Sequence, residues 1–264
     1  MKGRAICDAA TANFVVHASW AARRNPRALV ETNVSLTMVD SGLRSDTFNV
    51  ICGARLRAKD VASIALRAVE HFRAVDRPFS WWVAPGDEPE DLAQRLDEMG
   101  LDRQETERAM ALPLSTSGPR PVPEGVEVLE ARSPGDIASS ARINAENWDP
   151  PDAAVEAFYR DAATTLLKAD SPQKVFVAIR DGEPVGAVEL TLAAGGGGIY
   201  NLSTRVEQRR RGIGSALLER ACRYATASGA GTVVLQAAAA GASLYESFGF
   251  RELGLISELK PAHS

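Results

Sequence analysis

The fold is decided by the segment Gln208-Arg209-Arg210-Arg211-Gly212-Ile213-Gly214-Ser215, which follows an expected strand at 199–204 and opens an expected helix at 212–227. The first turn of a helix presents unpaired backbone N–H groups and the positive end of the helix dipole, so it can bind a phosphate group. Its two glycines allow close approach to the backbone, and its three arginines add charge suited to phosphates. The pattern favours a phosphate or pyrophosphate site, and a solvated basic helix cap is the alternative.

The sequence around this segment predicts a mixed α/β domain in the second half of the chain. Strands at 175–180, 187–192 and 199–204 should form an antiparallel meander, because the turn at 181–184 and the glycine run at 195–198 join them. Further strands are expected at 126–130, 232–237 and 251–260, and helices at 137–147, 152–167, 212–227 and 242–248. The result is a central sheet covered by helices.

The first half shows a similar but shorter order of elements. Helices are expected at 9–24, 59–75 and 89–99, and strands at 29–38, 47–56, 79–84 and 109–114. A stretch rich in proline and glycine at 115–125 separates the two halves. We therefore expect an N-terminal domain at 1–117, a linker at 118–125 and a C-terminal domain at 126–264.

The two halves look like distant copies of one arrangement. Residues 60–65 stand where 209–214 stand in the second half, but without the glycines and arginines, and Leu96 stands where Tyr245 stands. A chance likeness between two α/β halves is the alternative. If the halves are copies, the first has lost a site that the second retains.

Two motifs of the second half occur in a specific order. An R-x-x-G-x-G motif at 209–214 is followed by a helix, a strand and then Leu244-Tyr245-Glu246-Ser247-Phe248-Gly249-Phe250. This combination resembles the GNAT superfamily of acyl-CoA-dependent N-acyltransferases, over about 126–260. The resemblance implies an α/β fold of the α+β kind with two GNAT-like domains, each a central, mostly antiparallel mixed sheet flanked by helices. The first domain would be degenerate and the second catalytic.

The resemblance also implies that acetyl-CoA is the cosubstrate and that its pantetheine arm lies between the strands at 199–204 and 232–237. Backbone groups at 202–204 would bind the pantetheine or stabilise charge on the thioester oxygen. The arginine-rich loop would bind the pyrophosphate. The cofactor-binding residues implied in this way are Leu202, Ser203, Thr204, Arg209, Arg210, Arg211, Gly212, Ile213, Gly214 and Ser215.

The implied reaction is direct transfer of an acetyl group to a primary amine of a small molecule or peptide. Tyr245 matches the family's general acid, which protonates the departing thiolate, and a core aromatic is the alternative. The attacking amine must lose a proton, and the sequence does not settle what receives it. Gln236 stands where some relatives have glutamate, and an amide is no base. Glu189 and Glu146 are candidates, with solvated surface acids as the alternative.

Composition and charge limit the other classes of function. The chain has 30 Lys and Arg against 34 Asp and Glu, a net charge of −4, which argues against a nucleic-acid partner. It contains no apolar run of about 18 or more residues, so we expect no membrane span. The three cysteines lack a ligand spacing, which argues against a metal site and fits a reducing, cytoplasmic location.

Two other interpretations stay open. A non-catalytic acyl-CoA-binding sensor or scaffold is motivated by Gln236 and by the lack of an obvious base. An interaction module without a cofactor is the second, and the glycine-containing loop argues against it. We expect a monomer or a homodimer, and the identity of the amine acceptor is left open.

Overall fold

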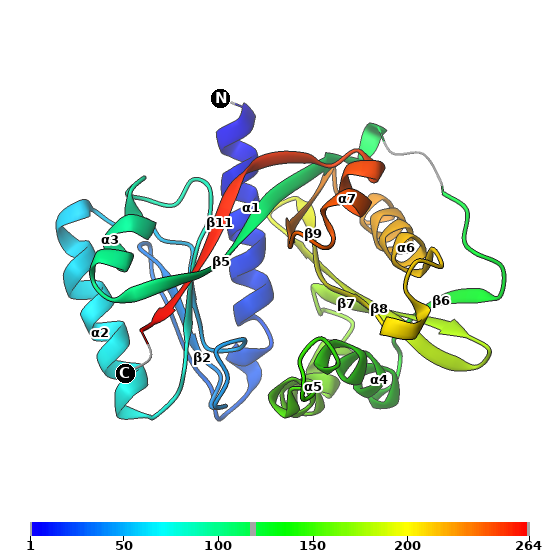
Figure 1. The fold of residues 1–264 in the computed structure, drawn as a ribbon, viewed down its shortest axis with the longest axis horizontal. Coiled ribbons are helices and arrows are strands. Elements are labelled where there is room, and N and C mark those ends of the chain that lie inside the picture. The colour runs from blue at the N-terminus through cyan, green and yellow to red at the C-terminus, as the bar shows by residue number, and fades with distance from the viewer. Residues whose placement is uncertain (1, 117–119, 263–264) are drawn as a thin grey trace. The chain divides into compact units, whose positions relative to one another are not determined.

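The computed structural model describes residues 2–116 and 120–262 (Figure 1), so the predicted linker lies partly outside the described residues. The chain divides into two compact units. Unit 1 contains the residues up to Met110, Gln236–Ala240 and the segment from Glu252, and unit 2 contains Ala111–Leu235 and Gly241–Arg251. The sequence-based division does not anticipate that the last strand belongs to unit 1. The assignment of a degenerate and a catalytic domain stays a prediction.

Unit 1 is built on a mixed sheet. Its strands, in spatial order, are β1 (Leu29–Thr32), β2 (Thr37–Asp40), β3 (Val50–Cys52), β4 (Ser80–Val83), β11 (Arg251–Pro261) and β5 (Leu101–Pro113). The β1–β2, β2–β3 and β4–β11 pairs are antiparallel, and the β3–β4 pair is parallel. The helices are α1 (Lys2–Ser19), α2 (Val61–Ala74) and α3 (Leu92–Glu98), with short 3-10 helices at Ala22–Arg24 and Ala58–Asp60.

Two neighbouring tryptophans on β4 show how helices cover both faces of this sheet. Adjacent residues of a strand point to opposite faces. Trp81 is fully buried in a core cluster with Phe72 of α2 and Leu96 of α3. Trp82 instead meets the ring of Phe14 of α1 edge to face, with 6.1 Å between ring centroids. Helix α1 therefore covers one face, and α2 and α3 cover the other.

The predicted single strand at 29–38 is wrong, because this stretch forms the β1–β2 hairpin. The side-chain oxygen of Asn33 accepts hydrogen bonds from the backbone N–H groups of Ser35 at 2.7 Å and Leu36 at 3.2 Å. The N–H of Asn33 also donates to the carbonyl of Leu36 at 3.1 Å. An asparagine side chain that bonds the backbone two residues on makes a turn, and this turn divides the stretch.

Two other elements are longer than their apolar patterns indicate. Helix α1 begins at Lys2 instead of residue 9, and β5 begins at Leu101 instead of residue 109. The first half of β5 is exposed and polar, so it lacks the apolar alternation that predicts a strand. An ion pair between Arg108 and Glu252, 2.6 Å apart, joins this polar part to β11.

The strands of unit 2 have the spatial order β10 (Thr232–Ala237), β9 (Gly196–Thr204), β8 (Glu183–Ala193), β7 (Gln173–Arg180) and β6 (Val126–Glu130). The predicted antiparallel meander β7–β8–β9 is confirmed, and β9 and β10 are parallel. The helices are α4 (Pro134–Ala145), α5 (Ala153–Leu166), α6 (Ile213–Ala227) and α7 (Ala242–Phe248), with 3-10 helices at Leu114–Thr116 and Val206–Gln208. The predicted fold class, mostly antiparallel mixed sheets with helices, is confirmed.

The two faces of the unit 2 sheet differ in character. Helix α6 packs tightly on one face, where a Cβ added to Gly186 would lie 2.9 Å from the side chain of Leu217. Residues 186 and 189 of β8 point to opposite faces because side chains alternate along a strand. On the second face the hydroxyl of Tyr159 of α5 reaches Glu189 of β8, and α4 packs on the same strands (Figure 1). This second face carries the polar groups described below.

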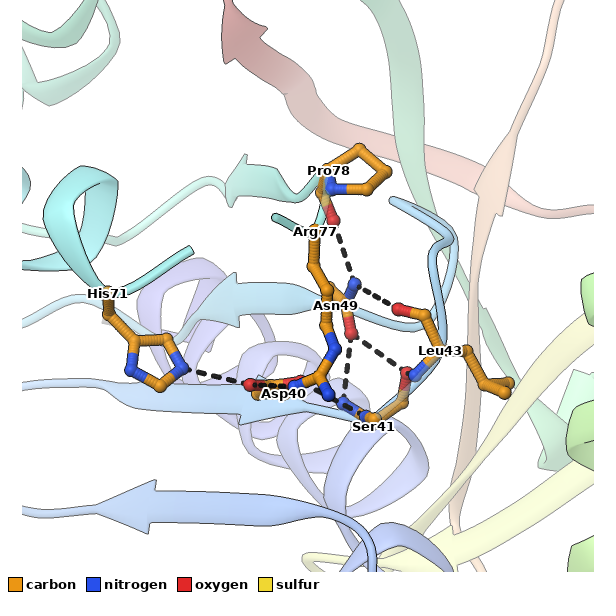
Figure 2. A network of polar contacts seen from close by, with 8 residues as sticks. Asp40, Ser41, Leu43, Asn49, His71, Arg77 and Pro78 are labelled. Carbon is orange, nitrogen blue, oxygen red and sulfur yellow. Dashed lines mark hydrogen bonds and ion pairs between the residues drawn. The ribbon is translucent and has the colours of Figure 1, made fainter. Parts of the chain in front are cut away.

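A buried carboxylate joins three segments of unit 1 (Figure 2). Asp40 at the end of β2 is only 2% exposed. It accepts a hydrogen bond from Nε2 of His71 at 2.9 Å, bonds from the guanidinium of Arg77 at 2.8 and 2.9 Å, and one from the N–H of Gly42 at 3.0 Å. A buried charge is tolerated when it is paired and hydrogen-bonded, as here.

Asn49 extends this network to the next loop (Figure 2). Its side-chain amide donates to the carbonyls of Leu43 at 2.9 Å and Pro78 at 2.8 Å. Its side-chain oxygen accepts from both the N–H and the hydroxyl of Ser41. A fully buried asparagine thus satisfies the backbone of a loop that could not otherwise be buried.

We predict that Asp40→Asn destabilises the protein by roughly 2–3 kcal/mol, because it removes the partner of the partly buried Arg77. Asp76→Asn is the matched control, since Asp76 is 82% exposed in its pair with Arg44, and it should change the stability by less than about 0.5 kcal/mol. Urea unfolding followed by tryptophan fluorescence measures both changes. Equal unfolding midpoints for the two variants would contradict this account.

Candidate functional site

Strand β9 contains a bulge at the centre of the unit 2 sheet. Ala187 of β8 pairs with Ser203, whereas Glu189 pairs with Tyr200, so β9 has one residue more than β8 in this interval. Asn201 lies within the interval and has a φ of 51°, in the left-handed region. The bulge re-aims the backbone that follows it.

The parallel pairing of β9 with β10 ends just before this bulge. The last paired residues are Ile199 and Leu235, yet β9 continues to Thr204. Leu202, Ser203 and Thr204, expected from the sequence to contact a pantetheine arm, lie beyond this parallel register. Ser203 and Thr204 still pair with β8, through Ala187 and Gly186, so only the edge of β9 that faces away from β8 is outside the ladder.

The arginine-rich loop follows β9 and leads into α6. Gly212 is the N-cap of α6 with a φ of 77°, and Arg210 is also left-handed at 63°. Nε of Arg209 donates to the carbonyl of Thr204 at 3.1 Å, which ties the loop to the end of β9. Arg209, Arg210 and Arg211 are all exposed. Since a glycine N-cap has no side chain to bond the first-turn N–H groups, these groups and the three cations favour an anion.

The two glycines of the loop have different surroundings. A Cβ on Gly212 would lie 2.8 Å from the ring of Pro123, too close for any side chain, and its φ is positive. A Cβ on Gly214 would meet Leu244 at 3.5 Å, which is ordinary van der Waals contact. Gly212 is therefore required by the fold, whereas Gly214 keeps space open in the first turn of α6.

The other two loop residues and the predicted acid lie around this turn. Ile213 is buried, and Ser215 is half-buried. Tyr245 is 8% exposed on α7, where its ring meets Phe250 edge to face at 5.8 Å. Because Leu244 reaches toward Gly214, α7 packs beside the first turn of α6. Tyr245 is thus on the helix next to the loop.

Glu189 is buried in a triangle of hydrogen bonds. It is 2% exposed, and its Oε1 accepts from the hydroxyl of Tyr159 at 2.5 Å and from Nδ2 of Asn201 at 2.9 Å. Nδ2 of Asn201 also donates to the oxygen of Tyr159 at 2.9 Å. Burial raises the pKa of Glu189, and the two hydrogen bonds to its charged form oppose that rise. Burial and the nearby carboxylate raise the pKa of Tyr159 well above its usual range, so the phenol keeps its proton.

Glu146, the second predicted base, lies in different surroundings. It is the C-cap of α4, is exposed, and pairs with Arg205 at 3.5 Å. The neighbouring Asn147 donates from Nδ2 to the hydroxyl of Ser203 at 2.8 Å. The loop after α4 therefore contacts the end of β9, and Glu146 takes part in an ion pair instead of the Glu189 triangle.

Three residues of this region are absent from the sequence-based set: Asn147, Tyr159 and Asn201. Asn201 carries a signal, because asparagine is depleted in strands and enriched in left-handed backbone. Tyr159 and Asn147 carry none, since their roles depend on which strand residues lie opposite them. Among the described residues, no three His, Cys, Asp or Glu side chains gather as a metal site. No helix in the described ranges is long and apolar enough to cross a membrane.

Comparison with known families identifies the segment that contains these features. Residues 171–252 match the family model described as Acetyltransferase (GNAT) domain. The chain carries a GNAT acetyltransferase domain. The matched residues include β7 to β10, the arginine-rich loop and Tyr245, so the resemblance predicted from the two motifs is confirmed for this GNAT segment.

Solved structures extend the GNAT likeness beyond that segment. A GCN5-related N-acetyltransferase from Kribbella flavida has a TM-score of 0.74 at 18% identity, with 96% of each chain covered. One from Sphaerobacter thermophilus has a TM-score of 0.58 at 17% identity, covering 89% of this chain and 84% of that one. A tandem GNAT protein from the clavulanic acid biosynthesis pathway has a TM-score of 0.62 at 15% identity, covering 94% and 88%. Comparison with curated proteins gave no match. The likeness establishes the fold for both halves.

Unit 1 repeats the order seen in unit 2, a parallel strand pair with a helix between the strands in the chain. Its β3 and β4 pair at Val50 with Ser80 and at Ile51 with Trp81, with α2 in between, just as α6 lies between β9 and β10 in the chain. A 3-10 helix precedes α2 at Ala58–Asp60, as one precedes α6. The predicted likeness of the two halves therefore appears in their topology.

The region beyond the parallel pair is closed in unit 1. The N–H of Glu88 donates to the carbonyl of Ala54 at 3.0 Å, and the N–H of Leu56 donates to the carbonyl of Glu88 at 2.9 Å. The guanidinium of Arg55 also bonds the carbonyl of Gly86 and pairs with Asp8 of α1. In unit 1, backbone groups on both sides of the parallel pair therefore bond each other beyond the strand ends. The corresponding edge of β9 in unit 2 lies beyond its register with β10.

We predict opposite effects for two glycine substitutions in the loop. Gly212→Ala should destabilise the protein by about 1–3 kcal/mol, because of the left-handed φ and the contact with Pro123. Gly214→Ala should leave stability unchanged or raise it by up to about 1 kcal/mol, because alanine favours the helix and fits the space. Thermal unfolding distinguishes them. A larger loss of stability in Gly214→Ala than in Gly212→Ala would contradict this prediction.

Proposed function

We propose that the chain is an N-acetyltransferase that transfers the acetyl group of acetyl-CoA to a primary amine of a small molecule or peptide. The observation that carries the proposal is the sequence of features after Ile199: the end of the parallel register with β10, then the arginine-rich loop, then a first turn of α6 that has no side-chain cap. An acyl-CoA needs a groove with backbone partners for its pantetheine and a cationic helix N-terminus for its pyrophosphate. Membership of residues 171–252 in the GNAT family supports the same cosubstrate.

The residues of the loop and strand fit this cosubstrate. Arg210 and Arg211 are exposed and free to turn toward phosphates, while the N–H groups of Ile213, Gly214 and Ser215 belong to the first turn of α6. The missing side chain at Gly214 keeps that turn accessible. Backbone groups of Leu202, Ser203 and Thr204 are proposed to bind the pantetheine and to stabilise negative charge that develops on the thioester oxygen.

Two side chains are proposed to move protons in the reaction. The N–C bond forms and the C–S bond breaks while one proton leaves the amine nitrogen and another reaches the sulfur. Glu189 is proposed to accept the first, directly or through water, since burial raises the pKa of its carboxyl toward the range useful for a base. Tyr245 is proposed to donate the second. Glu146 is the weaker candidate for base, because its carboxylate is already paired with Arg205.

We predict that calorimetric titration with acetyl-CoA gives one site per chain, because the parallel pair is open in unit 2 and closed in unit 1. Gly214→Asp should weaken the affinity at least about tenfold, since it adds a carboxylate at the proposed pyrophosphate position. An aspartate in the first turn of a helix is compatible with folding. Gly214→Ala is the uncharged control, because it adds a Cβ at the same position without a carboxylate.

The outcomes of this titration separate the alternatives. Absence of binding by the wild-type chain would overturn the cosubstrate, and two sites would overturn the closure of unit 1. Equal affinities of Gly214→Asp and the wild-type chain would remove the pyrophosphate from the first turn of α6.

We predict that Tyr245→Phe lowers kcat by roughly 10²-fold and changes the acetyl-CoA affinity by less than about twofold, because it removes only a proton donor. Release of free CoA thiol with a panel of primary amines measures turnover. Tyr224→Phe is the matched control, since the Tyr224 ring packs on Phe176 at the other end of α6 from the loop. Unchanged turnover in Tyr245→Phe would remove the acid role. Binding without transfer to any amine would instead favour an acyl-CoA sensor or scaffold.

A further inference from the structure

We propose that Tyr159 and Asn201 are positioning residues that hold the β9 bulge in place through the buried carboxylate of Glu189. The three side chains come from α5, β9 and β8 and form a closed triangle with sides of 2.5, 2.9 and 2.9 Å. Tyr159 and Asn201 are 42 residues apart in the chain. A contact of this kind joins the helix layer to the bulge itself.

The three hydrogen bonds of the triangle join the same three atoms, Oε1 of Glu189, the Tyr159 hydroxyl oxygen and Nδ2 of Asn201. The two acceptor oxygens lie only 2.5 Å apart, so one N–H group of the Asn201 amide is shared between them. The Tyr159 hydroxyl donates to Glu189 and accepts from Asn201. Both bonds to Glu189 fall on Oε1, so Oε2 receives neither. Glu189 and Tyr159 are buried and Asn201 is exposed, so the triangle connects a buried hydrogen bond to the surface of the bulge. A buried hydrogen bond in a low-dielectric surrounding restricts the positions of its partners.

The bulge needs such an anchor. A left-handed φ at a residue other than glycine costs on the order of 1 kcal/mol, and a bulge gives up ladder hydrogen bonds. Slippage of β9 by one residue would turn its side chains to the opposite face. The amide of Asn201, held by Tyr159 and Glu189, opposes that slippage because it fixes the one residue at which the register changes.

Under the proposed function, on which this consequence rests, the anchor has two effects. It keeps the β10-facing edge of residues 202–204 outside the parallel ladder, where the pantetheine is proposed to bind, while Ser203 and Thr204 stay paired with β8. It also holds Oε1 of Glu189 in place and leaves Oε2 as the oxygen available to a proton. Tyr159 and Asn201 thus act through Glu189 and through the backbone and need not touch the substrate.

The groups placed near Glu189 come from β7, β9, α4 and α5. Val175 of β7 and Tyr200 of β9 are its neighbours in the sheet register. Helix α4 contacts β8, and its buried polar residues are Ser140 and Asn144, which carry no charge. Tyr159 of α5 is the titratable group that acts on Glu189, and it lowers the pKa of the carboxyl against the effect of burial.

The first test measures how strongly the backbone of the bulge is protected from hydrogen exchange, and it needs no substrate. In hydrogen exchange of the full chain, Tyr159→Phe should speed exchange of the amides at 200–204 by about tenfold, the change expected for loss of one hydrogen bond to a charged group. Exchange in α6 should stay unchanged, and Tyr224→Phe should affect neither segment. Equal exchange at 200–204 in Tyr159→Phe and Tyr224→Phe would overturn the proposal.

Asn201→Gly gives a second test that does not depend on whether Tyr159→Phe folds. Glycine adopts a φ of 51° without strain, so the backbone conformation is retained while the amide hydrogen bonds are lost. If Asn201 served only to tolerate the left-handed conformation, Asn201→Gly would be silent. We expect faster exchange at 200–204, and unchanged exchange would overturn the role of its amide.

The third test is the pH dependence of kcat, which a purely structural role would not move. A base must be deprotonated to work, so the rate rises with pH through the pKa of Glu189. Loss of a donor in Tyr159→Phe or Asn201→Gly raises that pKa further and should shift the rising limb to higher pH. A limb that stays at the wild-type pH in both variants would overturn the coupling to Glu189.

Failure of the proposed function is distinguishable from failure of this inference. If the wild-type chain transfers no acetyl group, the carboxyl carbon of Glu189 can still be titrated by NMR, with Glu189→Gln to assign its signal. A higher midpoint in Tyr159→Phe than in Tyr224→Phe supports the triangle regardless of activity. Identical midpoints would overturn it.

Discussion

The candidate site depends on one constraint, the early end of the parallel pairing between β9 and β10. Backbone N–H and C=O groups need partners, and a strand that leaves its ladder must find them elsewhere. In β9 this happens at Ile199, and the bulge at Asn201 follows at once. The end of β9, the loop and the first turn of α6 then follow in covalent order. A single interruption of one ladder therefore places the strand edge that is proposed to bind the pantetheine next to the helix turn that is proposed to bind the pyrophosphate.

Two buried carboxylates show how the same chemical group serves different ends. Asp40 is surrounded by a guanidinium, an imidazole and a backbone N–H, which match its charge and fix a loop of unit 1. Within the part of the chain that the structure describes, the hydrogen bonds to Glu189 come from a phenol and an amide, which are neutral donors. Neutral donors compensate burial less completely than cations do, so the pKa of Glu189 stays raised. The first arrangement suits stability, and the second suits a group that takes up and releases a proton.

The sequence predicts elements well where their signals are local. The strand at 126–130 and the helix at 242–248 are found at those residues. The helix predicted at 137–147 is α4, which begins earlier, at Pro134, because Ser133 and Asp136 form a capping box that the apolar pattern does not show. The hairpin at 29–38 is missed because the Asn33 turn interrupts an otherwise strand-like stretch. The partner of β11 is missed for a different reason. Its alternation shows a strand, but nothing in a strand's own residues says that it pairs with β4, more than 170 positions away in the chain.

The same division applies to the site. Residues 209–215 can be recognised in the sequence because the features that favour an anion at a helix start, arginines and glycines before the first turn, occur in consecutive residues. Tyr159 and Asn201 are not, since only the register of β8 with β9 and the packing of α5 bring them to Glu189. Unit 1 shows that the order of elements alone does not produce an open site. It has the same order of strand, 3-10 helix, helix and strand, yet Arg55 and Glu88 fill the positions beyond its parallel pair. The common topology puts the ends of a parallel strand pair next to a helix start in both units. Whether that stretch of backbone is open to a ligand depends on the few groups that bond it.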